Sequence, residues 1–163
     1  MPSSRLRVHA VIVLWLFGLQ FLAGMILNLF VELPTTHPGA GGEYFSSSWK
    51  SLLWSMSDGG GWALLIHAWL AVLLFAGTLG LFLRSLPAGG RHWRWPSSIA
   101  ALFTLGALFN GLSFADYGED FSSMIMALCW LVAVALLVFA LVRTGRKPEP
   151  SAKPAGPPTR QSQ

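Results

Sequence analysis

Apolar residues form four long runs along the chain, separated by short polar stretches. The runs cover residues 9–31, 62–84, 96–115 and 121–143. Each has about 20 residues, and a helix of that length crosses a hydrocarbon layer of about 30 Å. The pattern therefore predicts an all-α polytopic membrane protein built as a bundle of four transmembrane helices.

One loop of this bundle carries a different pattern. Residues 33–42 are rich in turn-forming Pro and Gly. In residues 44–57 the apolar residues then recur at helical spacing, with polar residues between them. One face of that segment is apolar and the other is polar, which predicts a short amphipathic helix lying on the outer membrane surface, with its polar face toward water. The apolar face holds Phe45, Trp49, Leu52, Leu53 and Met56, and the polar face holds Ser46, Ser47, Lys50 and Ser51.

Composition agrees with the membrane assignment and limits the number of domains. Hydrophobic residues make up 53% of the 163 residues and charged residues 11%, whereas soluble domains carry about a quarter charged residues. Four spans leave no room for a second folded unit, so we expect one transmembrane domain over residues 1–143. Residues 144–163 include five prolines, and we expect a disordered tail there.

The charges are sorted by segment, and this sorting predicts the topology. Six of the seven carboxylates lie in 32–58 and 116–120, and ten of the eleven Lys and Arg residues lie outside these two stretches. By the positive-inside rule, both termini and the loop between the second and third spans are cytoplasmic. We therefore expect a multi-pass protein of the inner (plasma) membrane with both ends inside. The net charge of +4 is accounted for by these flanks and does not indicate nucleic-acid binding.

Polar residues within the apolar runs form stripes at helical spacing. Gln20, Gly24 and Asn28 share one face of the first run, and His67 lies on a face of small residues in the second. Such stripes serve helix packing in many membrane proteins. The topology also places several of them at one depth, in the outer third of the bilayer, where they define a candidate polar pocket. Its predicted members are Asn28, His67, Asn110, Ser113 and Ser122.

His67 is the histidine farthest inside a run, and three roles are open for it. The first role is that of a neutral side chain hydrogen-bonded to Asn28, Asn110 or a backbone carbonyl. The second is that of an axial ligand of a b-type haem, and the third is proton transfer or metal binding. A haem would take His37 or a methionine as its second ligand, because the topology puts His9 and His92 on the opposite side of the membrane. Copper is a further alternative, since several methionines are expected near the outer face. These are Met25, Met56, Met124 and Met126.

Catalytic signatures are missing from the sequence. It contains no H-E-x-x-H, G-x-S-x-G, P-loop or strand-linked G-x-G-x-x-G motif. The sequence therefore gives no support to a hydrolase or nucleotide-binding function.

Two segments resemble parts of small four-span bacterial integral membrane proteins that have no characterised activity. They are residues 28–34 leading to His37-Pro38-Gly39, and residues 109–114 leading to Asp116. The chain is also similar to four-helix haem proteins of the cytochrome b561 type, a resemblance that implies haem binding. It differs from that family in lacking paired intramembrane histidines.

Three functions follow as expectations. The first is a non-enzymatic structural or accessory membrane component, alone, as a homo-oligomer or in a larger membrane complex. The second is a haem-binding or redox protein that uses His67 as a ligand. The third is a transporter of small molecules or ions that acts as an oligomer.

Overall fold

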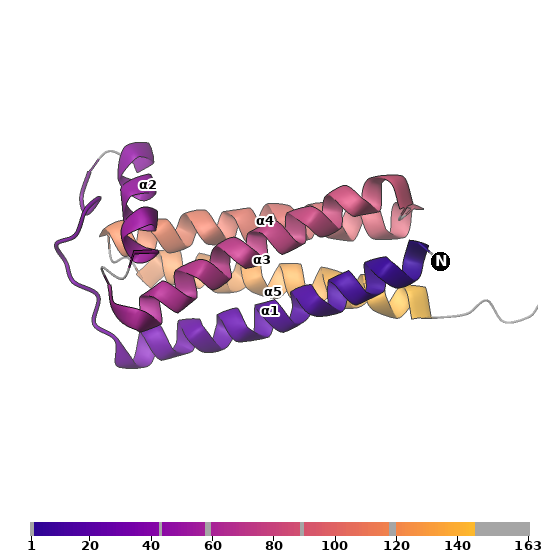
Figure 1. The fold of residues 1–163 in the computed structure, drawn as a ribbon, viewed down its shortest axis with the longest axis horizontal. Coiled ribbons are helices and arrows are strands. Elements are labelled where there is room, and N and C mark those ends of the chain that lie inside the picture. The colour runs from indigo at the N-terminus through magenta and orange to yellow at the C-terminus, as the bar shows by residue number, and fades with distance from the viewer. Residues whose placement is uncertain (1, 43, 58–59, 89, 118–119, 146–163) are drawn as a thin grey trace, which may run out of the picture.

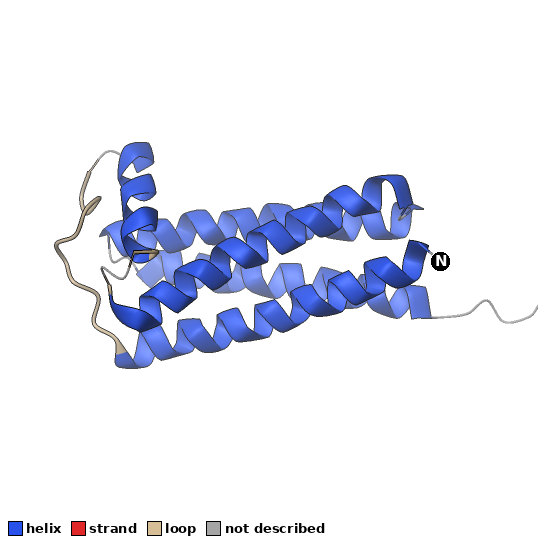
Figure 2. Ribbon diagram, in the orientation of Figure 1, coloured by secondary structure: helices blue, strands red, loops and turns tan. Residues whose placement is uncertain are grey.

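The structure is a computed structural model that describes residues 2–42, 44–57, 60–88, 90–117 and 120–145. This part of the chain forms five helices (Figures 1 and 2). They are α1 (Pro2–Phe30), α2 (Tyr44–Ser55), α3 (Gly61–Ala88), α4 (Gly90–Tyr117) and α5 (Asp120–Gly145). Each apolar run forms part of one long helix, except that Val31 of the first run follows the end of α1, and α2 lies in the first long loop. The predicted fold class is confirmed.

The long helices extend beyond the apolar runs. Each has 26 to 29 residues, so each is about 40 Å long and exceeds a hydrocarbon core of about 30 Å. The largest differences are at the starts of α1 and α4, which we expected at residues 9 and 96 but which lie at Pro2 and Gly90. Gly90 has a φ of 58°, a conformation that glycine adopts without steric cost and that allows a tight turn after α3. The extra turns bury Trp93 completely. Most of the predicted disordered tail, residues 146–163, lies outside the described residues.

The four long helices form a ring in the order α1, α3, α4, α5, with every neighbouring pair antiparallel (Figure 1). The pair α1 and α5 packs together much less extensively than the other neighbours. The start of α1, the turn before α4 and the end of α5 lie together at one end of the bundle, which we name the terminal end. Helix α2 lies across the opposite end, named the α2 end.

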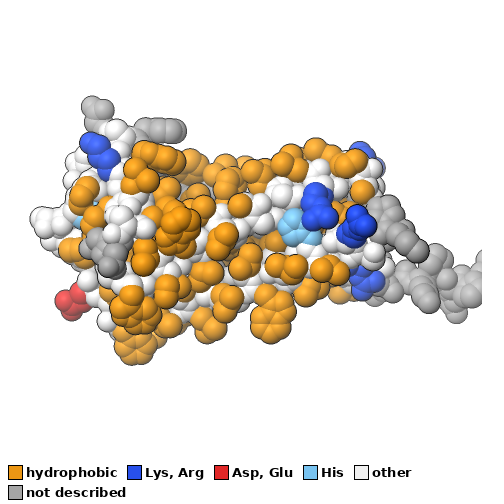
Figure 3. Space-filling view, in the orientation of Figure 1, with side chains coloured by type: hydrophobic (Ala, Val, Ile, Leu, Met, Phe, Trp, Pro, Cys, Tyr) orange, Lys and Arg blue, Asp and Glu red, His pale blue; other side chains and the backbone are white. Residues whose placement is uncertain are grey.

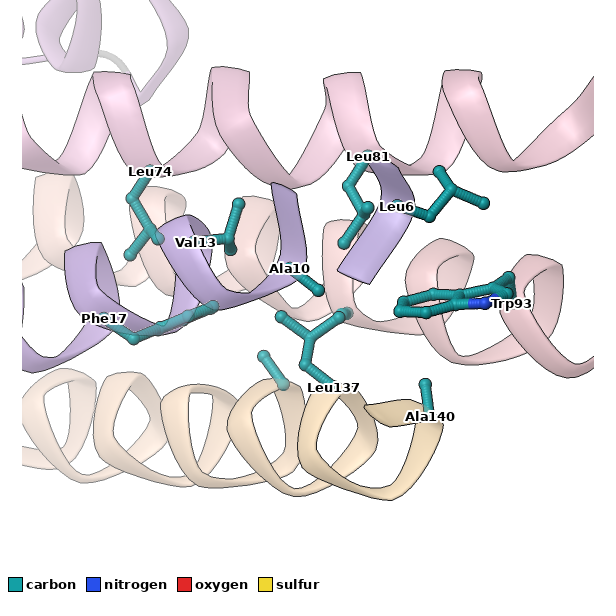
Figure 4. Close-up of a cluster of buried hydrophobic side chains, with 11 residues drawn as sticks. Leu6, Ala10, Val13, Phe17, Leu74, Leu81, Trp93, Leu137 and Ala140 are labelled. Carbon is teal, nitrogen blue, oxygen red and sulfur yellow. The ribbon is translucent and has the colours of Figure 1, made fainter. Parts of the chain in front are cut away.

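The tightly packed core occupies the half of the bundle toward the terminal end (Figure 4). Small residues let the helices approach closely here: Ala10 of α1, Ala100 of α4 and Ala133 of α5 are completely buried. Larger side chains fill the remaining space at the centre. They are Leu6, Val13, Phe17, Leu74, Leu81, Trp93 and Leu137.

The outside of the bundle is also apolar (Figure 3). Trp15, Leu73, Leu102 and Leu131 each expose half or more of their surface. Water would disfavour a continuous apolar surface of this kind, whereas lipid chains accommodate it. All four long helices have the length and composition of membrane spans, and the chain is an integral membrane protein.

The face of α2 that packs against the bundle differs from the one that the sequence predicts. Its serine face packs against the bundle, where Ser47 and Ser51 are buried, while Trp49 and Leu53 are 63% and 53% exposed. The prediction that the whole polar face would meet water was therefore wrong for Ser47 and Ser51, although Ser46 and Lys50 are exposed. The physical reason is a buried carboxylate at the end of α4, which draws serine hydroxyls inward.

Candidate functional site

A cavity of about 590 Å³ lies between the four long helices at the α2 end. Leu52 and Ser55 of α2 and residues 33–35 of the preceding loop are among its lining residues. Its walls are mainly apolar, with Leu64, Ala71 and Met126 among the lining residues. The volume falls in the range of about 300–1,000 Å³ that is typical of sites for small molecules.

The cavity ends at the middle of the bundle. Trp130 of α5 lies at its floor and donates a hydrogen bond from Nε1 to the carbonyl oxygen of Phe17 in α1, at 3.0 Å. The Trp130 ring also packs against Phe17 and Phe21, with ring centroids 6.3 and 5.3 Å apart. Below this aromatic cluster lies the close-packed core, so the described residues form a cavity that is closed at one end.

The polar stripe of α1 faces the cavity and meets His67 of α3. Gln20, Gly24 and Asn28 all line it. The Nε2 of Gln20 lies 3.1 Å from Nε2 and 3.3 Å from Nδ1 of His67, so the amide donates a hydrogen bond to the imidazole. Counting residues from the helix ends, this pair lies about 10–15 Å below the α2 end.

Gly24 provides the space for the imidazole. A Cβ atom at this position would lie 3.2 Å from Cε1 of His67, closer than most carbon contacts in proteins. The glycine in the stripe therefore lets the ring lie directly against the α1 backbone.

The Gln20–His67 pair does not satisfy all of its own hydrogen-bonding capacity. A primary amide has two N–H donors and a carbonyl acceptor, whereas a neutral imidazole offers one donor and one acceptor. Gln20 Oε1 is buried and has no hydrogen-bond partner among the described residues. An unpaired buried carbonyl costs about 1–3 kcal/mol, so the pair is suited to accept a further polar group.

Asp116, near the C-terminal end of α4, joins α2 to the bundle beside the cavity. Its carboxylate is buried and accepts hydrogen bonds from Ser48, at 3.2 Å, and from Ser51. Asp116 also lines the cavity. The carboxylate therefore holds α2 in place over the site.

Of the five predicted pocket residues, the structure places Asn28 and His67 in the cavity lining. The other three lie outside it. Asn110 donates a hydrogen bond to the carbonyl of Gly106 on its own helix, at 2.8 Å, and Ser122 is 3.4 Å from Ser113 between α5 and α4. These polar groups are paired locally, as side chains of this length often are in membrane helices.

The second candidate ligand, His37, is not brought to His67. Its ring stacks on Trp54, with centroids 4.4 Å apart, and its Nε2 lies 2.9 Å from the carbonyl oxygen of Ala115. His37 therefore fixes the first loop onto α2 and α4, and it is absent from the cavity lining. His9 lies at the other end of the bundle, next to Arg84.

The donor set around His67 does not match a metal or bis-histidine haem site. Among the described residues no three His, Cys, Asp or Glu side chains converge. The imidazole nitrogens of His67 both lie against the Gln20 amide. Met25 and Met126 share the cavity with His67, and these are the soft donors that remain near it.

Sequence reasoning did not identify Gln20 as the partner of His67. The stripe that contains Gln20 was visible, but the expected partners were Asn28, Asn110 or a backbone carbonyl, and Asn28 lies two turns closer to the α2 end. Ser123 lines the cavity in place of its neighbour Ser122, a shift of one residue that hydropathy alone cannot resolve. Asp116 was assigned to an acidic loop, and its burial in α4 became evident only with α2 packed against it.

The comparisons with known proteins give no further information on the site. No protein-family model, curated protein or solved structure matches the chain.

Proposed function

We propose that this protein is a non-enzymatic membrane component that binds a small, mainly apolar molecule in the closed-ended cavity. The observation that carries the proposal is the position of the Gln20–His67 pair inside an apolar cavity of about 590 Å³. Polar groups in the membrane interior are costly and usually mark a functional site. Their position beside an unfilled apolar space therefore indicates a ligand.

The chemistry of the walls indicates the kind of ligand. Leucine, alanine, methionine and phenylalanine side chains suit a hydrocarbon chain or ring, and the amide with its unpaired oxygen suits a hydroxyl or similar group. The ligand is therefore an amphipathic molecule with one hydrogen-bonding group that reaches the level of His67.

The charge distribution supports the orientation of the site. Arg5, Arg84 and Arg94 lie at the terminal end of the bundle, while Glu32 and Asp116 lie at the α2 end. By the positive-inside rule the terminal end is cytoplasmic, so the cavity opens to the outer side of the plasma membrane. In this orientation the ligand enters from the outer leaflet or the outer aqueous phase.

A haem role for His67 is the second candidate, favoured by the presence of Met25 and Met126 in the same cavity. It requires the imidazole to leave the Gln20 amide. The tightly packed half below Trp130 gives no support to a continuous transport path through a single chain.

Saturable photolabelling tests the proposal. A diazirine-bearing C12 alcohol is incorporated with the protein into liposomes, irradiated, and the labelled peptides are mapped with and without excess dodecanol. We expect dodecanol to suppress labelling of the cavity-lining residues of α3 and α5, such as Ala68 and Ala127, but not of the lipid-facing residues around Leu102.

Two cavity-filling variants and one control make the test specific. Ala71→Phe and Ala107→Phe place a ring in the cavity and are expected to abolish the saturable labelling, whereas lipid-facing Leu73→Phe leaves it unchanged. Labelling that dodecanol never suppresses, or that survives both filled variants, would contradict the proposal. A Soret band in the purified protein that is lost in His67→Ala would favour haem instead.

A further inference from the structure

A second site lies at the terminal end of the bundle, remote from the cavity. There α1 and α3 border a surface groove of about 520 Å³. Five of its lining residues belong to the first turns of α1 and one to the last turns of α3. They are Ser4, Arg5, Val8, His9, Ile12 and Arg84.

Two guanidinium groups from different helices meet at this groove. Arg84 Nη1 donates a hydrogen bond to His9 Nδ1 at 3.4 Å, and His9 also hydrogen-bonds to the backbone of Gly77 on α3. The histidine ring packs close to Gly80, with Cε1 3.5 Å from where a Cβ would lie. His9 therefore positions Arg84 next to α1, where Arg5 lies one turn away.

Among the side chains that the structure describes, no carboxylate lies near the groove to neutralise it. The described carboxylates are those of Glu32 and Asp116, and both lie at the α2 end. The groove also lies at the N-terminal end of α1, where the helix dipole adds a partial positive charge. An anion is the ligand that this electrostatic environment favours.

The other part of the groove is apolar. Val8 is 62% exposed and Ile12 is 55% exposed, and Ile12 lies one turn further toward the middle of the bundle than Val8. Figure 3 shows a histidine and basic side chains next to this apolar surface. The groove thus has arginine side chains at its edge and exposed aliphatic side chains beside them. A phospholipid has the same arrangement, with a charged headgroup joined to acyl chains.

We propose that this groove binds an anionic phospholipid, with its phosphate between Arg5 and Arg84 and an acyl chain along Val8 and Ile12. A basic pocket between two transmembrane helices at the membrane surface is suited to this headgroup. The site is independent of the cavity and of what the cavity binds.

Native mass spectrometry of the detergent-solubilised protein tests the site. Dissociation constants are measured for phosphatidylglycerol and for phosphatidylcholine of the same chain length. We expect phosphatidylglycerol to bind at least tenfold more tightly. Arg84→Gln and Arg5→Gln should each weaken its binding about fivefold, because each Lys or Arg near the surface contributes about that factor to the attraction of an anionic lipid.

The matched control is Arg94→Gln, which removes an exposed arginine at the same end of the bundle but outside the groove. It should change the affinity less than twofold. Equal affinity for the two lipids, or an equal loss in Arg94→Gln and Arg84→Gln, would overturn the proposal. Displacement of the lipid by millimolar inorganic phosphate would show a site for free anions and would also overturn it.

Discussion

At the scale of single residues, the hydrogen bond between Gln20 and His67 links α1 to α3 inside the membrane. Interhelical hydrogen bonds of this kind contribute roughly 0.6–2 kcal/mol. Removing one partner also leaves the other polar and buried, which adds a penalty. The two side chains should therefore be energetically coupled.

A double-mutant cycle measures that coupling. We expect Gln20→Leu and His67→Leu each to destabilise the protein by about 1 kcal/mol, and the double variant to lose less than the sum, with a coupling energy of roughly 0.6–2 kcal/mol. The measurement is reversible unfolding of the protein in mixed detergent micelles, followed by circular dichroism. Leu73→Ala, on the lipid-facing surface, is the control and should show no coupling with Gln20→Leu. Strict additivity of Gln20→Leu and His67→Leu would mean that the bond contributes nothing.

Also at this scale, the sequence identified which polar residues face the bundle interior better than it identified their partners. The stripe of Gln20, Gly24 and Asn28 follows from helical periodicity, and the structure places all three on the cavity. Asn110 has an equally suitable position in sequence but bonds back to Gly106. The choice between a neighbouring helix and the residue's own backbone depends on side-chain rotamers, which periodicity does not specify.

At the scale of elements, α2 is the part whose packing the sequence described least well. The pattern located the helix, but the burial of its serine face depends on Asp116 and on the loop that includes Gly39. Gly39 has a φ of 110°, and a Cβ there would collide with Ser51 Oγ and would lie 2.6 Å from the Ser47 carbonyl oxygen. The loop and the helix therefore fit together only with glycine at this position.

Gly39→Ala should release α2 while leaving the four long helices folded. We expect amide hydrogen exchange within residues 44–55 to become at least tenfold faster, which corresponds to about 1.4 kcal/mol of local stability, while α1 and α5 exchange as in the wild type. Gly41→Ala is the matched control, because Gly41 also has a positive φ of 67° but no atom lies within 4 Å of its Cβ position. It should have a smaller effect. An equal effect of both variants would show that backbone strain, and not the packing of Gly39 on α2, is responsible.

At the scale of the whole molecule, the bundle has two unlike halves. Four helices converge on a dry core toward the terminal end and surround a cavity toward the α2 end. The number of helices, their boundaries to within about two turns and the position of α2 follow from hydropathy, because each apolar run must satisfy its backbone hydrogen bonds within one helix. The cavity does not follow from hydropathy, because it results from the way that side chains of different size fill the space between helices.

The central proposal is that this cavity opens at the α2 end, on the outside of the cell, and takes up an apolar-tailed molecule. The most direct test is the modification of a single cysteine at position 71, in a chain with Cys129→Ser, by a small membrane-impermeant thiol reagent added to intact cells. Ala71 lines the cavity, and lipid-exposed Leu73→Cys is the control. We predict that the cysteine at 71 reacts and that dodecanol slows its reaction at least fivefold, while the cysteine at 73 does not react. A cysteine at 71 that reacts only after the cells are opened, or whose reaction dodecanol does not slow, would contradict the account.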